Sequence, residues 1–205
     1  MKQATIIISF LLLSILPVKA QTDNEIIANI EKASKEMTSL QCSFTQKKQV
    51  SIIDEVITSS GVLYYLRDTK LCWEYKKPYS YKFIMNGDKV MLKSGNTVNV
   101  FDTKSNKMFS QISKLIISGV DGSGISDKTR FDVSFATKGK DVVVTLVPKT
   151  KDIKKMFSEV LLHFDVQGYF IKEIEMIEPS GDKTDIILTD RIINKSIDEK
   201  VFHIE

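Results

Sequence analysis

The chain has 205 residues, of which 42% are hydrophobic and 27% are charged, and its formal net charge is +3. This composition is ordinary for a globular domain and excludes disordered, collagen-like and coiled-coil chains. No basic stripe runs through the sequence, so we expect no nucleic-acid partner. The two cysteines are too few for a dense disulfide framework.

The N-terminus has the pattern of a secretory signal. Lys2 precedes an apolar run at residues 6–16, and short side chains occupy positions 18 and 20. This pattern predicts that residues 1–20 are a signal peptide, cleaved before Gln21. An N-terminal membrane anchor is the alternative, but the run is shorter than the about 20 residues that a membrane span needs. We expect an exported, soluble chain in which residues 21–205 form a single domain.

A helix is predicted at residues 23–40. Its apolar side chains recur at helical spacing on one face, and they are Ile26, Ile27, Ile30, Ala33 and Met37. Asp23 is the predicted N-cap, and Glu25 lies in the first turn, where the helix dipole favours an acid. From Ser43 onwards the apolar period changes to two, which indicates strands.

Short segments of alternating apolar and polar residues follow, and we predict about eleven strands. Turn residues separate them, and Asn86-Gly87 is the strongest of these hairpin signals. The connections are mostly short and lack a strand–helix–strand rhythm, so the sheet should be antiparallel. A sheet of this size must curl or close to remain one domain. The predicted strands include residues 61–67, 71–75, 81–85, 90–93, 98–101, 131–135, 141–147, 160–164, 174–176, 184–188 and 201–205.

The strand pattern is interrupted at residues 107–120, where apolar residues recur at intervals of three and four. This spacing predicts an amphipathic helix, which the glycine-containing loop at residues 121–124 ends. A helix inserted between strands could lie across the mouth of a barrel with its apolar face inward. The predicted lid residues are Phe109, Ile112, Leu115 and Ile116.

The predicted inward positions of the sheet carry large apolar side chains. A barrel of this size can hold a small ligand. The alternative, for these residues and for the inserted helix, is a packed core without a cavity, and periodicity alone does not decide between the two. The predicted cavity residues are Phe44, Leu63, Tyr65, Trp73, Phe131, Val133, Phe135, Val160, Leu162 and Phe164.

The sequence carries few residues of the kinds that catalyse reactions or bind metals. Neither His163 nor His203 has a second histidine or a cysteine at ligand spacing, so no zinc site is predicted. Gly122-Ser-Gly124 is better explained as a loop than as a nucleophile turn. Glu173 and Glu175 share one face of a strand, and a solvated face explains them more simply than a catalytic carboxylate pair. We predict no catalytic residue, no metal, no cofactor and no enzyme.

The two cysteines are predicted not to form a disulfide. Cys42 shares strand parity with Phe44 and should point inward, whereas Cys72 alternates with Leu71 and Trp73 and should point outward. Side chains that leave a sheet on opposite faces cannot be bridged without moving the backbone.

Arg67 shares strand parity with Leu63 and Tyr65, which are predicted to point inward. A cation at the rim of an apolar cavity is costly unless it is hydrogen-bonded. Its guanidinium could hold backbone carbonyls of the inserted helix and so close the cavity reversibly. Alternatively, Arg67 lies at the strand end, extends into solvent and holds nothing. The residues alone leave both interpretations open.

Three segments, in this order, resemble the periplasmic outer-membrane lipoprotein carriers, the LolA-like proteins. They are Ser43-Phe-Thr-Gln46 after the first helix, Gly61-Val-Leu-Tyr-Tyr-Leu-Arg67, and Leu71-Cys-Trp-Glu-Tyr75 followed by Pro78. The resemblance covers almost the whole mature chain. It places the family's arginine, which helps to latch the lid, at Arg67. Two positions depart from the family, since Asp68 stands where proline is usual and Leu71 where an aromatic residue is usual.

The resemblance implies a fold that is mainly β with helices (α+β), an incomplete antiparallel β-barrel of about eleven strands, covered by an N-terminal helix and an inserted lid helix. It implies a periplasmic carrier that shelters lipoprotein acyl chains and ferries them from the inner to the outer membrane. The partners would be acylated lipoproteins or other exported lipids, inner-membrane release machinery and an outer-membrane acceptor, with the carrier a monomer. The alternative is a related open-barrel envelope protein that carries another lipid, or senses lipid or protein partners without transport.

Overall fold

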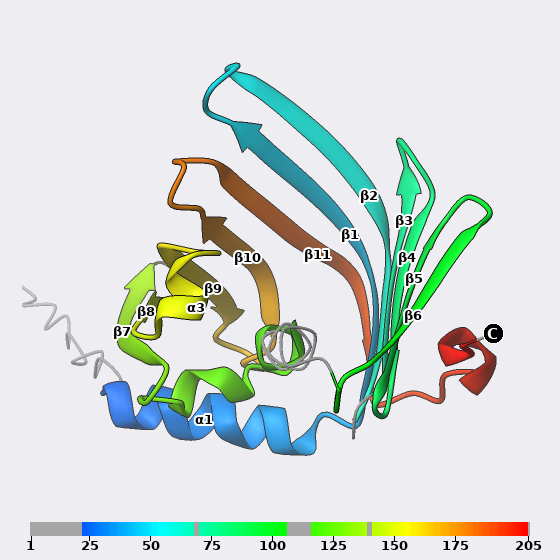
Figure 1. The fold of residues 1–205 in the computed structure, drawn as a ribbon. Coiled ribbons are helices and arrows are strands. Elements are labelled where there is room, and N and C mark those ends of the chain that lie inside the picture. Colours follow the sequence, from blue (N-terminus) through cyan, green and yellow to red (C-terminus); the bar gives the residue numbers. More distant parts are fainter. Residues whose placement is uncertain (1–21, 68–69, 106–115, 139–140, 205) are drawn as a thin grey trace, which may run out of the picture.

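A computed structural model describes residues 22–67, 70–105, 116–138 and 141–204 of the chain (Figure 1). The first part of the fold comprises α1 (Asp23–Glu36), β1 (Ser39–Val50), β2 (Glu55–Leu66), β3 (Lys70–Lys77), β4 (Tyr81–Asn86), β5 (Lys89–Ser94) and β6 (Thr97–Asp102). The second part comprises the 3-10 helix η1 (Ser123–Ser126), β7 (Phe131–Lys138), β8 (Asp141–Pro148), α3 (Lys151–Lys154), β9 (Glu159–Asp165), β10 (Ile171–Ile177), β11 (Lys183–Ile193) and the 3-10 helix η2 (Glu199–Phe202).

The eleven strands of the described residues belong to one antiparallel sheet, in the order β6-β5-β4-β3-β2-β1-β11-β10-β9-β8-β7. Strands β1 and β11 pair in the middle of the sheet, so its two edges are β6 and β7. The sheet curls, with α1 crossing one end of the curl, and it stays open (Figure 1). The predicted fold class is confirmed as a mainly β, incomplete antiparallel barrel with helices.

The N-cap of α1 is Thr22, whereas the sequence pattern indicated Asp23. The Thr22 hydroxyl accepts a hydrogen bond from the Glu25 N–H, and the Glu25 carboxylate accepts one from the Thr22 N–H at 2.9 Å. This reciprocal capping box satisfies two N–H groups at the start of the helix. The helix ends at Glu36 instead of residue 40, because β1 already begins at Ser39.

The main core lies between the concave face of the sheet and the helices. Along β1, Leu40, Cys42 and Phe44 are buried, while Gln41 and Ser43 between them are only half-buried. This is the alternation of a strand with one face on a core. Helix α1 adds its apolar stripe to the same cluster, with Ile26, Ile30 and Met37.

A second, smaller apolar cluster lies on the convex face of the sheet. It joins Cys72, Ile84 and Met91, from β3, β4 and β5, to Phe202 of η2. The strand predicted at residues 201–205 is wrong, because residues 199–202 form η2 beside this face (Figure 1). Phe202 has no exposed surface, so its burial on the sheet, and not strand pairing, holds this segment.

Both cysteines are free, as predicted. Cys42 belongs to the main core and Cys72 to the cluster on the opposite face. Although Cys72 points away from the main core, it is fully buried, because η2 covers it. Burial raises the pKa of the Cys42 thiol to about 12 and that of the Cys72 thiol to about 11.

We expect neither thiol of the folded protein to react with an alkylating reagent at neutral pH, because burial disfavours the thiolate. Phe202→Ala should uncover Cys72 alone and lower the free energy of unfolding by about 3 kcal/mol. Alkylation followed by peptide mass spectrometry measures labelling at each cysteine, and urea unfolding measures stability. Equal labelling of Cys42 and Cys72 in the folded variant would contradict the assignment of Phe202 as the cover of one face.

The inserted helix is described from residue 116. Residues 116–121 are helical, and Gly122 then takes the left-handed conformation at φ 76° that commonly ends a helix. Of the predicted lid residues, Ile116 packs against the main core. The other three, Phe109, Ile112 and Leu115, lie outside the described residues.

Polar contacts tie this segment to the sheet and to α1. The Tyr65 hydroxyl donates to Asp121 Oδ2 at 3.1 Å, which joins β2 to the helical residues. The Ser126 hydroxyl donates to the Glu31 carboxylate, which joins η1 to α1. The helices therefore form one connected cover over the concave face. Within the described part of the chain, no helix combines the length and apolar character needed to cross a membrane.

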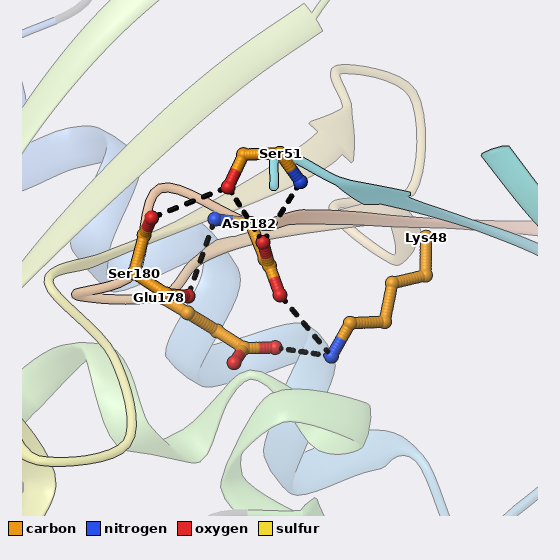
Figure 2. A network of polar contacts seen from close by, with 5 residues as sticks. All are labelled: Lys48, Ser51, Glu178, Ser180 and Asp182. Atoms are coloured by element: carbon orange, nitrogen blue, oxygen red, sulfur yellow. Dashed lines mark hydrogen bonds and ion pairs between the residues drawn. The ribbon is translucent and has the colours of Figure 1, made fainter. Parts of the chain in front are cut away.

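A polar network fixes the end of the β1–β2 hairpin against the β10–β11 turn (Figure 2). Ser51 donates to Asp182 Oδ1 from its backbone N–H at 2.9 Å and from its hydroxyl at 2.8 Å. Lys48 Nζ lies 2.7 Å from Glu178 Oε1 and 4.0 Å from Asp182 Oδ2. The backbone N–H of Ser51 is the largest cause of a lowered pKa at Asp182, which keeps that carboxylate charged. This rim of the open sheet is therefore held by five residues, Lys48, Ser51, Glu178, Ser180 and Asp182.

Candidate functional site

An apolar cavity of about 350 Å³ lies inside the curl of the sheet. Its walls come from β1, β3, β4 and β7 to β11, from residues 116–124, and from α3 with the residues after it. The volume lies at the lower end of the range of about 300–1,000 Å³ that small-molecule sites occupy. Both halves of the sheet contribute, so the cavity exists only because the sheet curls.

The predicted cavity residues fall into three groups. Those that line the cavity are Trp73, Phe131, Val160 and Leu162, and the predicted lid residue Ile116 lines it too. Buried in the adjoining core, and not among the described lining residues, are Phe44, Leu63, Tyr65 and Phe164. Val133 and Phe135 are partly buried and pack against that core. A packed core and a cavity, which the sequence presents as alternatives, therefore coexist.

Several lining residues are not singled out by the sequence. On the strands, Gln46 shares parity with Phe44, and Tyr75 shares parity with Trp73, so alternation was the signal that could have found them. Tyr81 and Phe83 follow in the same way on β4. A different group lies in and after α3, where only the three- and four-residue spacing of a short helix marks Ile153, Met156 and Phe157.

A shallow apolar groove adjoins the cavity. It is lined by Ile57, Ser59, Tyr75, Pro78, Tyr79 and Tyr81, and Tyr75 and Tyr81 line the cavity as well. Next to Ile57 of the groove, the β1–β2 hairpin exposes further large apolar side chains, Ile52, which is 89% exposed, Ile53 and Val56. The cavity therefore continues into an apolar rim.

Arg67 follows β2 and holds the end of α1. Its Nη2 lies 2.6 Å from the carbonyl oxygens of Ser34 and Lys35, and 2.5 Å from that of Met37. The last carbonyls of a helix lack partners within it, and a cation there interacts favourably with the helix dipole. Among the described residues, Arg67 contacts the end of α1, because β2 ends beside the C-terminus of that helix, and the Arg67 N–H donates to the Thr38 carbonyl at 2.9 Å. Much of the inserted helix lies outside the described residues, so its contact with Arg67 stays a prediction.

A charged cluster occupies the convex face of β9, β10 and β11. His163 Nε2 lies 2.6 Å from Glu175 Oε1, and Lys183 Nζ lies 2.9 Å from Glu175 Oε2. Burial raises the pKa of Glu175, but hydrogen bonds from Lys183 and His163 outweigh it, so the net pKa is below the ordinary value. The Glu175 carboxylate is therefore engaged by two side chains, whereas the sequence suggested a solvated strand face. Within the described residues, no three His, Cys, Asp or Glu side chains are grouped so that they could hold a metal ion.

Glu175→Gln should lower the free energy of unfolding at neutral pH by about 1 kcal/mol, because Lys183 loses its carboxylate partner and His163 loses a hydrogen bond to it. A lowered folded-state pKa contributes stability above the ordinary pKa of 4.5, and the contribution disappears as the pH falls through the folded-state value. Urea unfolding should therefore separate variant and wild type most at pH 7, and the difference should shrink as the pH is lowered below 4.5. Glu173→Gln is the matched control, and an equal loss there would refute the prediction.

The geometry defines a class of protein. The cavity wall is almost entirely apolar, so a ligand is held by contacts that are non-directional and proportional to its apolar area. The helices that cover the wall are joined to the sheet by polar contacts of Arg67 and Tyr65, and η1 is joined to α1 by that of Ser126. Fold and site together define an open-barrel protein with an internal apolar cavity.

The chain belongs to the LolA family, the outer membrane lipoprotein carrier proteins, whose family model matches residues 35–205. This confirms the family that the sequence motifs resembled. An outer-membrane lipoprotein carrier protein from Pseudomonas aeruginosa is 30% identical over 70% of this chain and 66% of its own length. Another, from Pseudomonas fluorescens, is 26% identical over 96% of this chain and 93% of its own.

A solved structure with a similar fold is the Pseudomonas aeruginosa MucA/MucB complex. The match has a TM-score of 0.54 at 10% sequence identity, and it covers 88% of this chain and 60% of the matched chain. MucB solved by itself matches with the same TM-score of 0.54. At this identity the likeness concerns the fold alone.

Proposed function

We propose that this chain is a periplasmic carrier that shelters lipoprotein acyl chains in its cavity and ferries them from the inner to the outer membrane. The observation that carries the proposal is an apolar cavity of about 350 Å³ that opens toward an apolar rim. Each CH₂ group left in water costs about 0.8 kcal/mol, so an acyl chain needs such a space to travel between membranes. Membership of the carrier family supports the same role.

The proposal has a defined set of participants. Residues 1–20 act as a signal peptide cleaved before Gln21, and residues 21–205 act as one domain and as a monomer. The cargo is an acylated lipoprotein or another exported lipid, passed on from inner-membrane release machinery to an outer-membrane acceptor. The carrier performs no catalysis, and release of fatty acid from acyl esters by the purified protein would contradict this.

Mass spectrometry of what co-purifies with the protein from its native envelope tests the proposed function. We expect acylated lipoprotein to co-purify with the wild-type protein. A variant with a charged residue in the cavity wall should co-purify with much less of it. A protein that purifies without lipid, and that takes up no diacylated lipopeptide from vesicles, would overturn the proposal.

A second candidate is an envelope protein that binds a protein partner without transporting lipid. A similar fold occurs in MucB, which was solved in complex with MucA, so the fold is compatible with a protein partner. The same co-purification distinguishes the two functions, because a protein partner without lipid supports the second candidate and acylated cargo supports the first.

A further inference from the structure

Three polar side chains of the cavity wall, on β1, β3 and β4, lie close together. Of the described side chains that line the cavity, only Gln46, Trp73, Tyr75, Tyr81 and Ser118 carry nitrogen or oxygen. Tyr75 and Tyr81 also line the groove, so they mark the junction between cavity and groove. Gln46 is hydrogen-bonded to Tyr75, and we call Gln46, Tyr75 and Tyr81 the polar trio.

The trio assembles across an intervening strand. Gln46 lies on β1 and Tyr75 on β3, with β2 between them. The β2 residue beside Tyr75 is Gly61, where a Cβ would lie 1.9 Å from the Glu74 carbonyl oxygen and 2.9 Å from the Phe44 ring. Without a side chain there, Phe44 and Tyr75 meet edge to face at a ring-centroid distance of 5.0 Å. Tyr75 is thus positioned to reach β1.

The hydrogen bond within the trio leaves donors available. The Tyr75 hydroxyl donates to Gln46 Oε1 at 2.8 Å, so the bond engages the oxygen of the amide. The two N–H groups of that amide have no partner among the described residues. Burial raises the pKa of Tyr75 to about 12, so its hydroxyl keeps its proton as a donor. Tyr81, paired with Tyr75 in the β3–β4 register, adds a second hydroxyl. A nearby donor, the buried Trp73 Nε1–H, has no acceptor among the described residues.

Donors at the junction of an apolar cavity and an open groove suit one kind of ligand, an apolar chain that ends in an acceptor. An acyl ester has this form, because its chain is apolar and its carbonyl oxygen only accepts hydrogen bonds. The chain would lie in the cavity, and the remainder of the cargo would leave along the groove past Pro78 and Tyr79.

We propose that the polar trio is a binding site for the ester carbonyl of acyl cargo, with the Gln46 amide as the donor and Tyr75 as the residue that orients it. This inference rests on the proposed carrier function and adds a recognition element to it. The trio sets the depth to which a chain enters the cavity, because the carbonyl must stop at the junction.

The site is tested by measuring the binding of two synthetic lipopeptides. The two are identical except that the chains are ester-linked in one and ether-linked in the other. Wild-type protein should bind the ester about tenfold more tightly, which corresponds to one hydrogen bond of about 1.4 kcal/mol. Gln46→Leu should abolish this preference and leave ether affinity unchanged within about twofold, since the apolar wall is intact. Tyr75→Phe should reduce the preference by freeing the amide. Gln49→Leu, on the same strand with an exposed side chain, is the matched control and should keep it.

The outcomes separate this inference from the proposed function. Equal binding of ester and ether by the wild type, or loss of the preference in Gln49→Leu, would overturn the trio as a carbonyl site and leave the carrier function standing. Binding of neither lipopeptide would overturn the carrier function itself.

A phospholipid with the same ester-linked chains identifies the source of the ester. Tighter binding of the lipopeptide supports lipoprotein cargo, and tighter binding of the phospholipid overturns that assignment.

Discussion

Val160→Glu should abolish uptake of acylated cargo while the protein still folds. Val160 lines the cavity and is only half-buried, so the new carboxylate can tilt toward the open space without disrupting the packed core. An acyl chain entering beside it would desolvate an unpaired charge, which costs several kcal/mol, or about a hundredfold or more in affinity. The measurement is transfer of a diacylated lipopeptide from vesicles to the protein, with circular dichroism to establish folding.

The matched control is Val147→Glu. Val147 lies on β8 and is 44% exposed, so a glutamate there meets water and should leave uptake unchanged. A glutamate at Leu63 is less informative, because Leu63 is fully buried in the core and its replacement tests folding instead of binding. Equal loss of uptake at Val160 and Val147 would argue against an internal binding site.

Arg67→Leu should give a protein that loads cargo and fails to deliver it. Nη2 of Arg67 lies within hydrogen-bond distance of three carbonyl oxygens at the end of α1. If the cover must lift for cargo to enter, these charge-assisted bonds break on loading and form again on release. Each is worth about 1.5–3 kcal/mol, so losing one favours the loaded state about tenfold or more. A two-step assay, from donor membranes to the carrier and then to acceptor membranes, should show cargo accumulating on the carrier.

Two further variants make this result specific. Arg67→Lys should restore delivery only partly, because an ammonium is more strongly hydrated than a guanidinium and is carried on a more flexible stem. Arg191→Leu removes another arginine that donates to carbonyls, those of Phe170 and Ile171, and that pairs with Asp165, away from α1. It should cost stability without blocking delivery. Normal delivery by Arg67→Leu would leave Arg67 as a helix cap with no role in transfer.

Local features of the chain were predictable because neighbouring residues decide them. The Asn86-Gly87 turn joins β4 to β5, with Gly87 at φ 60° as such a tight turn requires. Strand alternation predicted opposite faces for Cys42 and Cys72, and short connections predicted an antiparallel sheet. Each of these features depends on a few neighbouring residues, so it can be predicted without knowledge of the fold.

Burial on the convex face was not predictable in the same way. Cys72 and Phe202 are separated by most of the chain, and alternation marks only the direction in which Cys72 points. Residues 201–205 alternate like a strand, but packing of Phe202 onto β3–β5 stabilises a 3-10 helix at Glu199–Phe202. The strand propensity of these residues is therefore overridden by the packing of Phe202, a contact that requires the assembled sheet.

The sequence by itself determined the antiparallel, mainly β architecture, the first helix, the family and the absence of a disulfide, since periodicity, turn chemistry and motif order all act locally. Only the tertiary structure decided which apolar side chains line a cavity and which fill the core, because both kinds occupy the same strand face. It also decided that Arg67 holds α1, and that Tyr75 meets Gln46 across Gly61. These contacts depend on the curl of the sheet. The curl accumulates from the small twist between each pair of neighbouring strands in the eleven-stranded sheet, so no single segment of the sequence predicts it.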